Sequence, residues 1–536
     1  MEKASHQWRI LAVLCLAVLL VAIDNTIVNV ALPTISRNLH ASNSALQWIV
    51  DGYSLPFAAL MLAGGGFGDR WGRRRVMALG LLFFSAFSLL ATFSHTVSSL
   101  IAARSLMGVS AAFILPATLS IVTVTFKDAK QRAVAFGIWG AAVGIAIAVG
   151  PIAGGELITH FWFGSVFLVN VPLGVLSILA LWLVVPESRT PRRRRFDVVG
   201  LTLGTVAVTS LTLAIIEGPS WGWRSGSTLS LFAAAVVALA WFVRYESRHE
   251  SPLFEVRIFT NRAFSAGALS IVVNYFLLMG FIFLVTQYFQ SVRGYSALSA
   301  GLRTLPFAGT VMATTPLGAI LAARVGARYV VPTGMLLMSG ALAWMTTQGV
   351  DSAYFGPVVG SMVVLAIGFS LISAPSTAVT MGALPPHQVG AGAAVNETNR
   401  ELGGTLGVAV IGSVFSSLFG PAVRRALSPY LAHGLSSQSL TVAQSSMQAA
   451  TSVVSRLPVA SQSLAHQALT SAFMQGFHRA CLVAAGIGVV TAAVTFLHLP
   501  RGPLAQIEHP LERPDEQSVH AEETSRATSL TRELRT

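Results

Sequence analysis

Charged residues are scarce in this sequence. Asp, Glu, Lys and Arg together make up 11% of its 536 residues, whereas hydrophobic residues make up 53% and the mean hydropathy is +0.67. A soluble protein of ordinary composition carries about a quarter charged residues. The composition therefore excludes an ordinary soluble domain and indicates an all-α protein with many membrane-spanning helices.

Cysteine is also rare, with 2 residues in the chain. Cys15 and Cys481 both lie inside apolar runs, so the sequence indicates no disulfide framework. No nucleotide-binding loop of the GxxxxGKS or GxxxxGKT type occurs, so ATP is not expected to drive this protein. The histidines lie mostly in connectors, without the clustering that a metal or hydrolytic site needs. We therefore expect no enzyme activity, no metal and no bound cofactor.

Positive charge exceeds negative charge, with 35 Lys and Arg residues against 22 Asp and Glu residues. The arginines gather in short connectors beside apolar runs, as at 192–195, where they orient helices toward the cytoplasm. A nucleic-acid partner is therefore not expected. We predict a multi-pass protein of the bacterial cytoplasmic membrane, embedded in the lipid bilayer, with both termini in the cytoplasm.

Fourteen apolar stretches are candidate spans, because crossing about 30 Å of hydrocarbon takes about 20 residues. Six fall within residues 1–186 and six within residues 263–500, which predicts two six-helix bundles. Residues 187–262 hold basic linkers and two inserted helices. Within the second bundle, residues 421–470 are rich in Ser, Gln and Ala and are expected to form an external segment. Residues 501–536 are polar and are expected to be a disordered cytoplasmic tail.

An internal repeat supports the two bundles. Two short motifs recur about 250 residues apart: Leu55-Pro56-Phe57-Ala58 as Leu305-Pro306-Phe307-Ala308, and Arg70-x-Gly72 as Arg324-x-Gly326. At a similar offset Asn274 stands where Asp24 stands, so the second half lacks this carboxylate. Repeats of this kind form two halves that rock around a site near the middle of the membrane.

Three ionisable residues inside the predicted spans of the first bundle are functional candidates: Asp24, Asp51 and Arg104. An ionisable group within a span costs several kcal/mol unless it is paired or hydrated. At 1.5 Å per residue, Asp24 lies about 13 Å, Asp51 about 7 Å and Arg104 about 10 Å from the outer ends of their spans. One arginine neutralises one carboxylate, which leaves the other free to exchange a proton. We predict that these residues couple transport to protons; a structural polar contact is the alternative for each aspartate.

A charged turn over residues 65–75 separates the second and third spans, and its key positions are Gly65, Asp69, Arg70, Gly72 and Arg73. Glycines allow helix ends to approach closely, and the arginines indicate a cytoplasmic turn. The simplest interpretation is a topological anchor. The alternative is a conformational gate that locks one state, with its arginines contacting the facing bundle.

The fifth span contains a run of small residues, Gly150-Pro151-Ile152-Ala153-Gly154-Gly155. Such glycines allow close contact between helices, and Pro151 removes one backbone hydrogen bond. Ordinary small-residue packing is the alternative to a functional role for Gly150, Pro151, Gly154 and Gly155.

These motifs resemble those of the major facilitator superfamily of transporters. The charged turn resembles the loop signature between helices two and three, and the run at Gly150 resembles the antiporter signature, with Ala146 at one expected glycine. Arg104-x-x-x-Gly108 looks like the fourth-helix signature of proton-coupled members, although Met107 replaces a common glutamine. The aspartate motif from Asp24 to Pro33 and the Arg400-to-Gly404 motif are similar to the fourteen-helix drug:H+ antiporter branch. The resemblance covers residues 8 to about 500.

The resemblance implies a proton-driven exporter of small lipophilic or cationic drugs that works by alternating access. Tyr53, Trp139 and Phe276 are candidate substrate contacts through cation–π attraction, although aromatic residues near span ends are more often interface anchors. Glu397 is a candidate cation contact, and a solvated helix end is its alternative. A dedicated exporter of one metabolite, antibiotic or lipid, and a receptor without transport, are the competing functions. We expect a monomer. Whether the protein uses a periplasmic adaptor is left open by the sequence.

Overall fold

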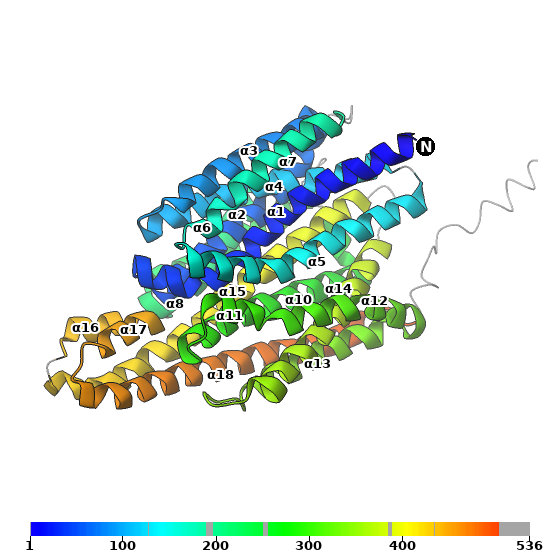
Figure 1. Cartoon of the computed structure of the whole chain (residues 1–536). Coiled ribbons are helices and arrows are strands. Elements are labelled where there is room, and N and C mark those ends of the chain that lie inside the picture. The colour runs from blue at the N-terminus through cyan, green and yellow to red at the C-terminus, as the bar shows by residue number, and fades with distance from the viewer. Residues whose placement is uncertain are drawn as a thin grey trace, which may run out of the picture.

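The computed structural model describes residues 2–126, 128–188, 197–249, 256–383, 389–433 and 435–502. Within these ranges the chain is built from helices and contains no strand. Figure 1 shows long helices that run roughly side by side along one direction. The predicted basic cluster at 192–195 and nearly all of the predicted tail after 501 lie outside the described residues.

The N-terminal half contains the first helices of the chain. They are α1 (Glu2–Leu39), α2 (Asn43–Trp71), α3 (Arg73–Thr92), α4 (Val97–Thr125), α5 (Ala129–His160), α6 (Ser165–Leu168) and α7 (Asn170–Val184). Several begin at a polar cap: the Ser42 Oγ accepts a hydrogen bond from the Ala45 backbone N–H at the start of α2, and Asp128 caps α5 in the same way. These caps satisfy backbone donors that the helix itself leaves unpaired.

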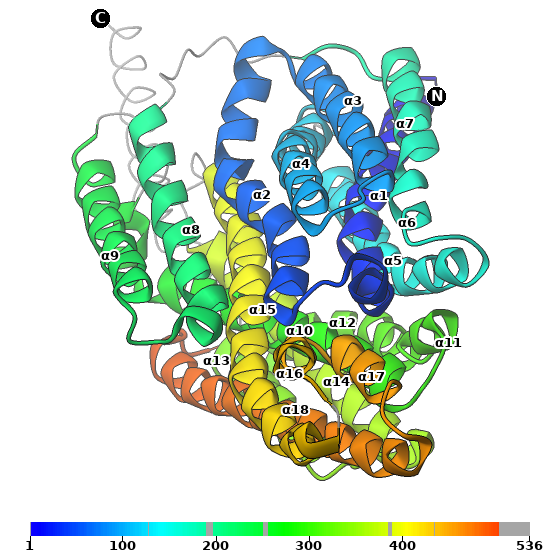
Figure 2. The same ribbon diagram turned by 90° about the vertical axis from the view of Figure 1, so that its left-hand side faces the viewer.

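Two inserted helices follow, α8 (Val198–Trp221) and α9 (Gly226–Glu246), and then the short helix η1 (Val256–Thr260). Figure 2 shows α8 and α9 side by side, with α8 next to α2 and α15. The inserted pair therefore lies against the line along which the two halves meet.

The C-terminal half contains the remaining elements. They are α10 (Arg262–Gln287), η2 (Tyr288–Val292), α11 (Ala297–Leu302), α12 (Leu305–Val325), α13 (Ala327–Met345), η3 (Tyr354–Val358), α14 (Val359–Gly382), α15 (Val389–Leu427), η5 (Ser428–His433), α16 (Ser437–Ala443), α17 (Met447–Val454) and α18 (Val459–His498). The residues predicted as an external segment form the end of α15, then η5, α16, α17 and the start of α18.

The two ends of the molecule differ. One end, which we call the arginine end, carries the N-terminus and the turns at Gly72 and Gly326. The opposite end, which we call the cap end, carries α16 and α17 with the adjoining ends of α15 and α18 (Figures 1 and 2). Odd and even spans alternate between these ends, so α1 runs from the arginine end to the cap end and α2 returns.

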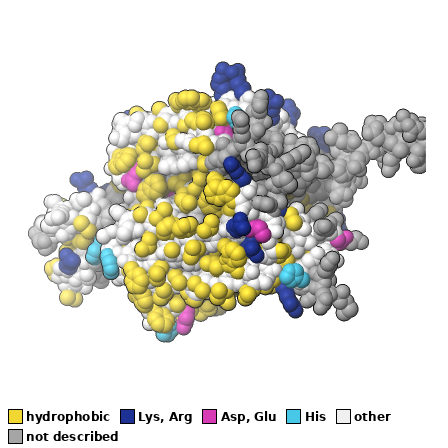
Figure 3. Space-filling model, turned by 90° about the horizontal axis from the view of Figure 1, so that it is seen from above, with side chains coloured by type: hydrophobic (Ala, Val, Ile, Leu, Met, Phe, Trp, Pro, Cys, Tyr) yellow, Lys and Arg dark blue, Asp and Glu magenta, His cyan; other side chains and the backbone are white. Residues whose placement is uncertain are grey.

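The helices suit a membrane. Among the described residues, 12 helical segments are long and apolar enough to cross one. Helices α2 and α13 pack among them but are not part of this set, so fourteen spans stays a prediction. Hydrophobic side chains make up much of the face shown in Figure 3, and few charged side chains interrupt them.

The charged turn is shorter than the sequence analysis predicted. Helix α2 continues through Gly65, Asp69 and Arg70 to Trp71, and α3 begins at Arg73, so the break is Gly72 alone. Gly72 has φ +106°, a backbone conformation that suits glycine. The expected turn over 65–75 is therefore wrong in extent, because the glycines at 64–68 do not by themselves end a helix.

Candidate functional site

The centre of the N-terminal half holds a buried ion pair. Asp24 of α1 and Arg104 of α4 meet at 2.5 Å between Oδ2 and Nη1, and both side chains are 0% exposed. A buried charge is tolerated when its partner and further hydrogen bonds satisfy it. The structure therefore brings together two of the three residues predicted from the sequence.

Three further groups support this ion pair. Arg104 Nε donates to the Ile49 carbonyl at 3.2 Å, and the Tyr53 ring lies 4.3 Å from the guanidinium carbon. Asn170 of α7 donates from Nδ2 to Asp24 Oδ1 at 2.7 Å and to Ser88 Oγ at 3.0 Å. Each Asp24 oxygen thus has a donor, while Arg104 Nη2 has no hydrogen-bond partner among the described residues.

Asp51 lies apart from this ion pair. Its side chain is 0% exposed, and neither carboxylate oxygen has a hydrogen-bond partner in the described part of the chain. Asp51 precedes Tyr53 by two residues, which places the two side chains on opposite faces of α2 at 100° per residue. Since Tyr53 faces Arg104, the expected arrangement of one arginine between two carboxylates is not present. A proton on Asp51 would remove the cost of burying an unpaired charge.

The glycine run of α5 touches both halves of the protein. A Cβ at Gly150 would lie 2.0 Å from Thr26 Oγ1, and one at Gly154 would lie 2.8 Å from Ile27 Cγ1. Because glycine has no side chain, α5 can pack closely on α1 at the level of Asp24. A Cβ at Gly155 would lie 2.4 Å from the Leu298 Cα of α11, in the other half. The Thr26 hydroxyl also donates to the Ala146 carbonyl at 3.3 Å.

Pro151 also faces the C-terminal half, because a Cβ at Gly301 of α11 would lie 2.2 Å from its carbonyl oxygen. The residues of this run therefore divide between two contacts. Gly150 and Gly154 pack on the helix that carries Asp24, whereas Pro151 and Gly155 pack on α11 near the cap end. Helix α5 links the ion pair to the seam between the halves.

The four candidate substrate contacts are all engaged within the protein. Tyr53 is 0% exposed against Arg104, and the Trp139 indole donates to Thr118 Oγ1 at 3.1 Å. Phe276 is 7% exposed and its backbone packs on Gly407. Glu397 forms an ion pair with Arg400 at 2.9 Å. In this state all four side chains are buried or paired within the protein, so their role in substrate binding stays a prediction.

Glu401 is part of the Arg400-to-Gly404 motif, but the sequence analysis did not single it out as a candidate site residue. It lies one turn beyond Glu397 on α15, and its carboxylate makes no hydrogen bond or ion pair among the described residues. Helix α15, which carries Glu401, packs on α2 across the seam. The spacing of four residues from Glu397 was the available signal, since it places both carboxylates on one face of a helix.

Asn170 and Ser88 were also missed. Both are 0% exposed polar side chains inside apolar runs, which is a signal of function or of a buried polar contact. The sequence could not show that Asn170 of α7 donates to both Asp24 of α1 and Ser88 of α3, because these residues lie on three different helices.

The turn at Gly72 is held by its own half. Glu187, just after α7, accepts hydrogen bonds from the backbone N–H groups of Arg74 at 3.1 Å and Arg75 at 3.3 Å. Arg74 also donates from Nη1 to the Val185 carbonyl at 3.2 Å and lies 4.5 Å from the Trp182 ring. Arg74 and Arg75 therefore do not contact the facing bundle in this state. Arg70 is exposed, Arg73 is half-buried, and the side chain of Asp69 lies outside the described structure.

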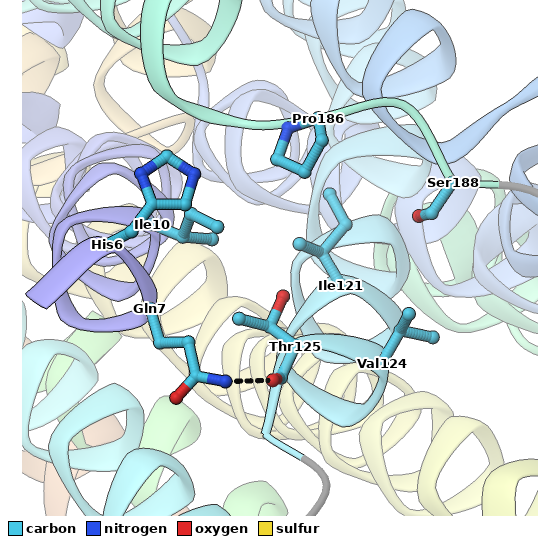
Figure 4. A pocket seen from close by; sticks show the side chains of 8 residues that line it. All are labelled: His6, Gln7, Ile10, Ile121, Val124, Thr125, Pro186 and Ser188. Carbon is cyan, nitrogen blue, oxygen red and sulfur yellow. Dashed lines mark hydrogen bonds between the residues drawn. The ribbon is translucent and has the colours of Figure 1, made fainter. Parts of the chain in front are cut away.

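A pocket of about 260 Å³ lies behind this turn, at the arginine end. It is bounded by the start of α1, the end of α4 and the segment after α7, and Figure 4 shows Gln7 reaching across to the Thr125 carbonyl. Ser188, which lines the pocket, accepts a hydrogen bond from the Arg73 backbone N–H at 2.9 Å. The pocket is lined by residues of one half, so it is separate from the seam.

The arrangement is better suited to proton exchange than to catalysis of a covalent reaction. It offers a buried ion pair, a second buried carboxyl at Asp51 and an unpaired carboxylate at Glu401. Across the described residues, no group of three His, Cys, Asp or Glu side chains could hold a metal ion. Long apolar helices around buried titratable groups define a class, the multi-pass membrane transporters.

The comparisons identify the family. The profile of the Major Facilitator Superfamily matches residues 14–408, and the chain belongs to that superfamily, as its motifs predicted. It is 35% identical over 91% of its length to the multidrug efflux pump LfrA of Mycolicibacterium smegmatis, covering 96% of that protein. It is 34% identical over 77% of its length to the tetracenomycin C resistance and export protein of Streptomyces glaucescens, also covering 77% of that protein.

A solved structure has the same fold. A bacterial homologue of the human lysosomal transporter Spinster, in an inward-facing and unoccupied conformation, matches with a TM-score of 0.65 at 18% identity, over 94% of this chain and 98% of that one. The family and the fold together make this protein a transporter of small molecules rather than an enzyme.

Proposed function

We propose that this protein exports small lipophilic or cationic drugs across the bacterial cytoplasmic membrane in exchange for protons. The observation that supports proton coupling is the buried Asp24–Arg104 pair, whose carboxylate can exchange a proton only when its surroundings rearrange. The names of the relatives support the substrate class. The proton gradient is the energy source, no cofactor is needed, and the monomer is the working unit.

The two ends of the molecule take opposite sides of the membrane in this proposal. The arginine-rich connectors favour a cytoplasmic arginine end with both termini, and hence an external cap end.

The contacts of α5 support alternating access. Gly140, Gly144, Pro151 and Gly155 fall within one face of α5, by the count of 100° per residue. At the cap end of this face, Gly155 packs on α11. Toward the arginine end, a Cβ at Gly140 or Gly144 would meet no atom within 4 Å beyond its chain neighbours and the local helix backbone. The face is closed at the cap end and open toward the arginine end, as expected of a state that receives substrate from the cytoplasm.

In the transport cycle, Asp24 would take up a proton from the external side and release it after the change to the state described here. The unpaired Glu401, on the other side of the seam, would attract a cationic substrate once Asp24 has released its proton and pairs with Arg104. Glu397, which is paired with Arg400, would contribute less.

Ethidium efflux from energised cells that lack their own pumps tests this proposal. Wild type should show efflux that a protonophore stops, and Asp24→Asn should lose it at an equal level of protein in the membrane. Uncoupler-sensitive efflux in Asp24→Asn would contradict the role of Asp24. Since one relative is named for a single antibiotic, absence of ethidium efflux in wild type would favour a dedicated exporter over a multidrug exporter.

A further inference from the structure

Three helices meet near the cap end, and each belongs to a different part of the protein. Helix α2 comes from the N-terminal half, α15 from the C-terminal half, and α8 from the inserted pair (Figure 2). Two consecutive residues of α2, Gln47 and Trp48, contact the other two helices. The function proposed above does not explain why α8 takes part in this contact.

Gln47 joins α2 to α15. Its side chain is 0% exposed, and Nε2 donates to the carbonyls of Val408 at 3.2 Å and Ala409 at 3.0 Å. A Cβ at Gly412 would lie 2.2 Å from that nitrogen, so the glycine makes room for the amide. This contact spans the seam between the two halves.

Helix α8 contacts both sides of the same seam. The Trp48 indole donates to Glu217 Oε1 at 3.0 Å, which joins α8 to the N-terminal half. Ser413 Oγ of α15 donates to the Ile215 carbonyl at 2.5 Å, which joins α8 to the C-terminal half. Gln47 and Trp48 are neighbours in sequence, as are Gly412 and Ser413, so the three polar contacts lie within about one helical turn of one another.

Alternating access requires α2 and α15 to separate at the cap end, since they belong to different halves. Helix α8 cannot keep both of its hydrogen bonds when they do. We propose that α8 is an outer clamp: its bonds to Trp48 and Ser413 hold the seam closed at the cap end and favour the state that is open at the arginine end. This inference rests on the proposed alternating access, but not on the identity of the substrate. It gives the inserted helices a function beyond linking the bundles.

Cysteine accessibility tests the clamp without any substrate. The reporter is Ala409→Cys, a position at the seam with 0% exposure, in full-length protein with Cys15→Ser and Cys481→Ala. Intact cells, in which the cap end faces the external side of the membrane, are labelled with a membrane-impermeant maleimide. Trp48→Phe removes the indole N–H and keeps a ring, and Ser413→Ala removes the hydroxyl donor.

Each of these variants should raise the labelling rate by at least about two- to tenfold, the range that the net worth of one neutral hydrogen bond gives. Glu217→Gln keeps an acceptor oxygen for Trp48 but removes its charge, so it should raise the rate less than Trp48→Phe does. The matched control Trp241→Phe removes an indole N–H at a 61% exposed position on α9 and should leave the rate unchanged. Labelling equal to the parent in both Trp48→Phe and Ser413→Ala would overturn the clamp.

A second reporter separates opening from unfolding. Ala111→Cys on α4 is 0% exposed, and α4 packs mainly on α2 and α3 of its own half. Opening at the cap end raises labelling at 409 but not at 111. A rise at both positions would show a general loss of structure and would also count against the clamp. Because labelling is measured in the absence of substrate, failure of drug efflux leaves this result interpretable.

Discussion

The two halves share a plan but differ at the position that carries the charge. Asp24 of α1 is paired with Arg104 and Asn170, whereas Asn274, about 250 residues later on α10, donates one hydrogen bond to the Phe369 carbonyl at 3.4 Å. Both side chains are 0% exposed. An amide needs no counter-charge, so the C-terminal half keeps the polar contact without an arginine. The difference shows that the duplicated helices supply the frame and that one half supplies the buried charge.

The two equivalent turns differ in a similar way. Gly72 and Gly326 both have positive φ, at +106° and +95°, and both donate to the carbonyl four residues earlier. A Cβ at Gly72 would lie 2.7 Å from the Glu187 carboxylate, and one at Gly326 would lie 2.6 Å from the Gly502 carbonyl. The first turn is therefore closed by a charged side chain and the second by backbone.

The largest effect on efflux is expected from a cross-link that prevents the two halves from moving relative to each other. A Cβ at Gly412 would lie 3.0 Å from Gln47 Cγ, which suits a disulfide with Cβ atoms about 3.5–4.5 Å apart. Oxidised Gln47→Cys/Gly412→Cys should lose drug efflux entirely, and dithiothreitol should restore it. Each single cysteine variant is the control. Undiminished efflux after complete cross-linking would mean that this seam does not open.

The next largest effect concerns the ion pair. Arg104→Leu leaves Asp24 buried without its cation and should lower the free energy of unfolding by about 3–5 kcal/mol. Adding Asp24→Asn makes this position resemble Asn274 and should recover most of that stability, but not efflux. Thermal unfolding of the purified protein and ethidium efflux measure the two effects. If the double variant is as unstable as the single one, charge burial is not the cause.

Asn170 and Asn274 allow a direct comparison between the halves. Asn170→Ala removes a hydrogen bond to a charged group, which should cost about 1.5–3 kcal/mol, whereas Asn274→Ala removes a neutral bond worth about 0.5–1.5 kcal/mol. Asn170→Ala should also shift the external pH at which efflux is half-maximal, because it changes the surroundings of Asp24. Asn274→Ala should not shift it. The same shift in both variants would remove the distinction between the halves.

The smallest expected effect is the difference between two turns, at Gly72 and at Gly222. Gly72→Ala should destabilise the protein by about 1–3 kcal/mol through backbone strain, with an added loss from displacing Glu187. Gly222→Ala is the matched control, since Gly222 has φ +91° and no atom within 4 Å of a Cβ. The difference in thermal midpoint between the two variants reports the Glu187 contact. Equal midpoints would show that Glu187 gives way freely.

The sequence predicted several residues of this site, but it did not predict which of them contact one another. Asp24 and Arg104 were predicted because charges are rare inside apolar runs, and the structure pairs them. Asp51 was predicted for the same reason, yet it lies on the other face of α2. Tyr53 was predicted as a substrate contact, which stays a prediction, and its ring packs on Arg104 in this state. Distance from the end of a span gives depth in the membrane, but the rotation of each helix decides which side chains meet.

By itself, the sequence determined that the chain is built from long apolar helices and belongs to the Major Facilitator Superfamily, because hydropathy and short motifs are local properties. The sequence also predicted a turn between the second and third spans, but not that Gly72 alone forms the break. Only the tertiary structure decided that Asn170 joins Asp24 to Ser88, that Gln47 fits at Gly412, and that α8 contacts both halves. The hydrogen bonds of these contacts join residues 82 to 362 positions apart. They depend on how whole helices pack, which no stretch of the sequence encodes alone.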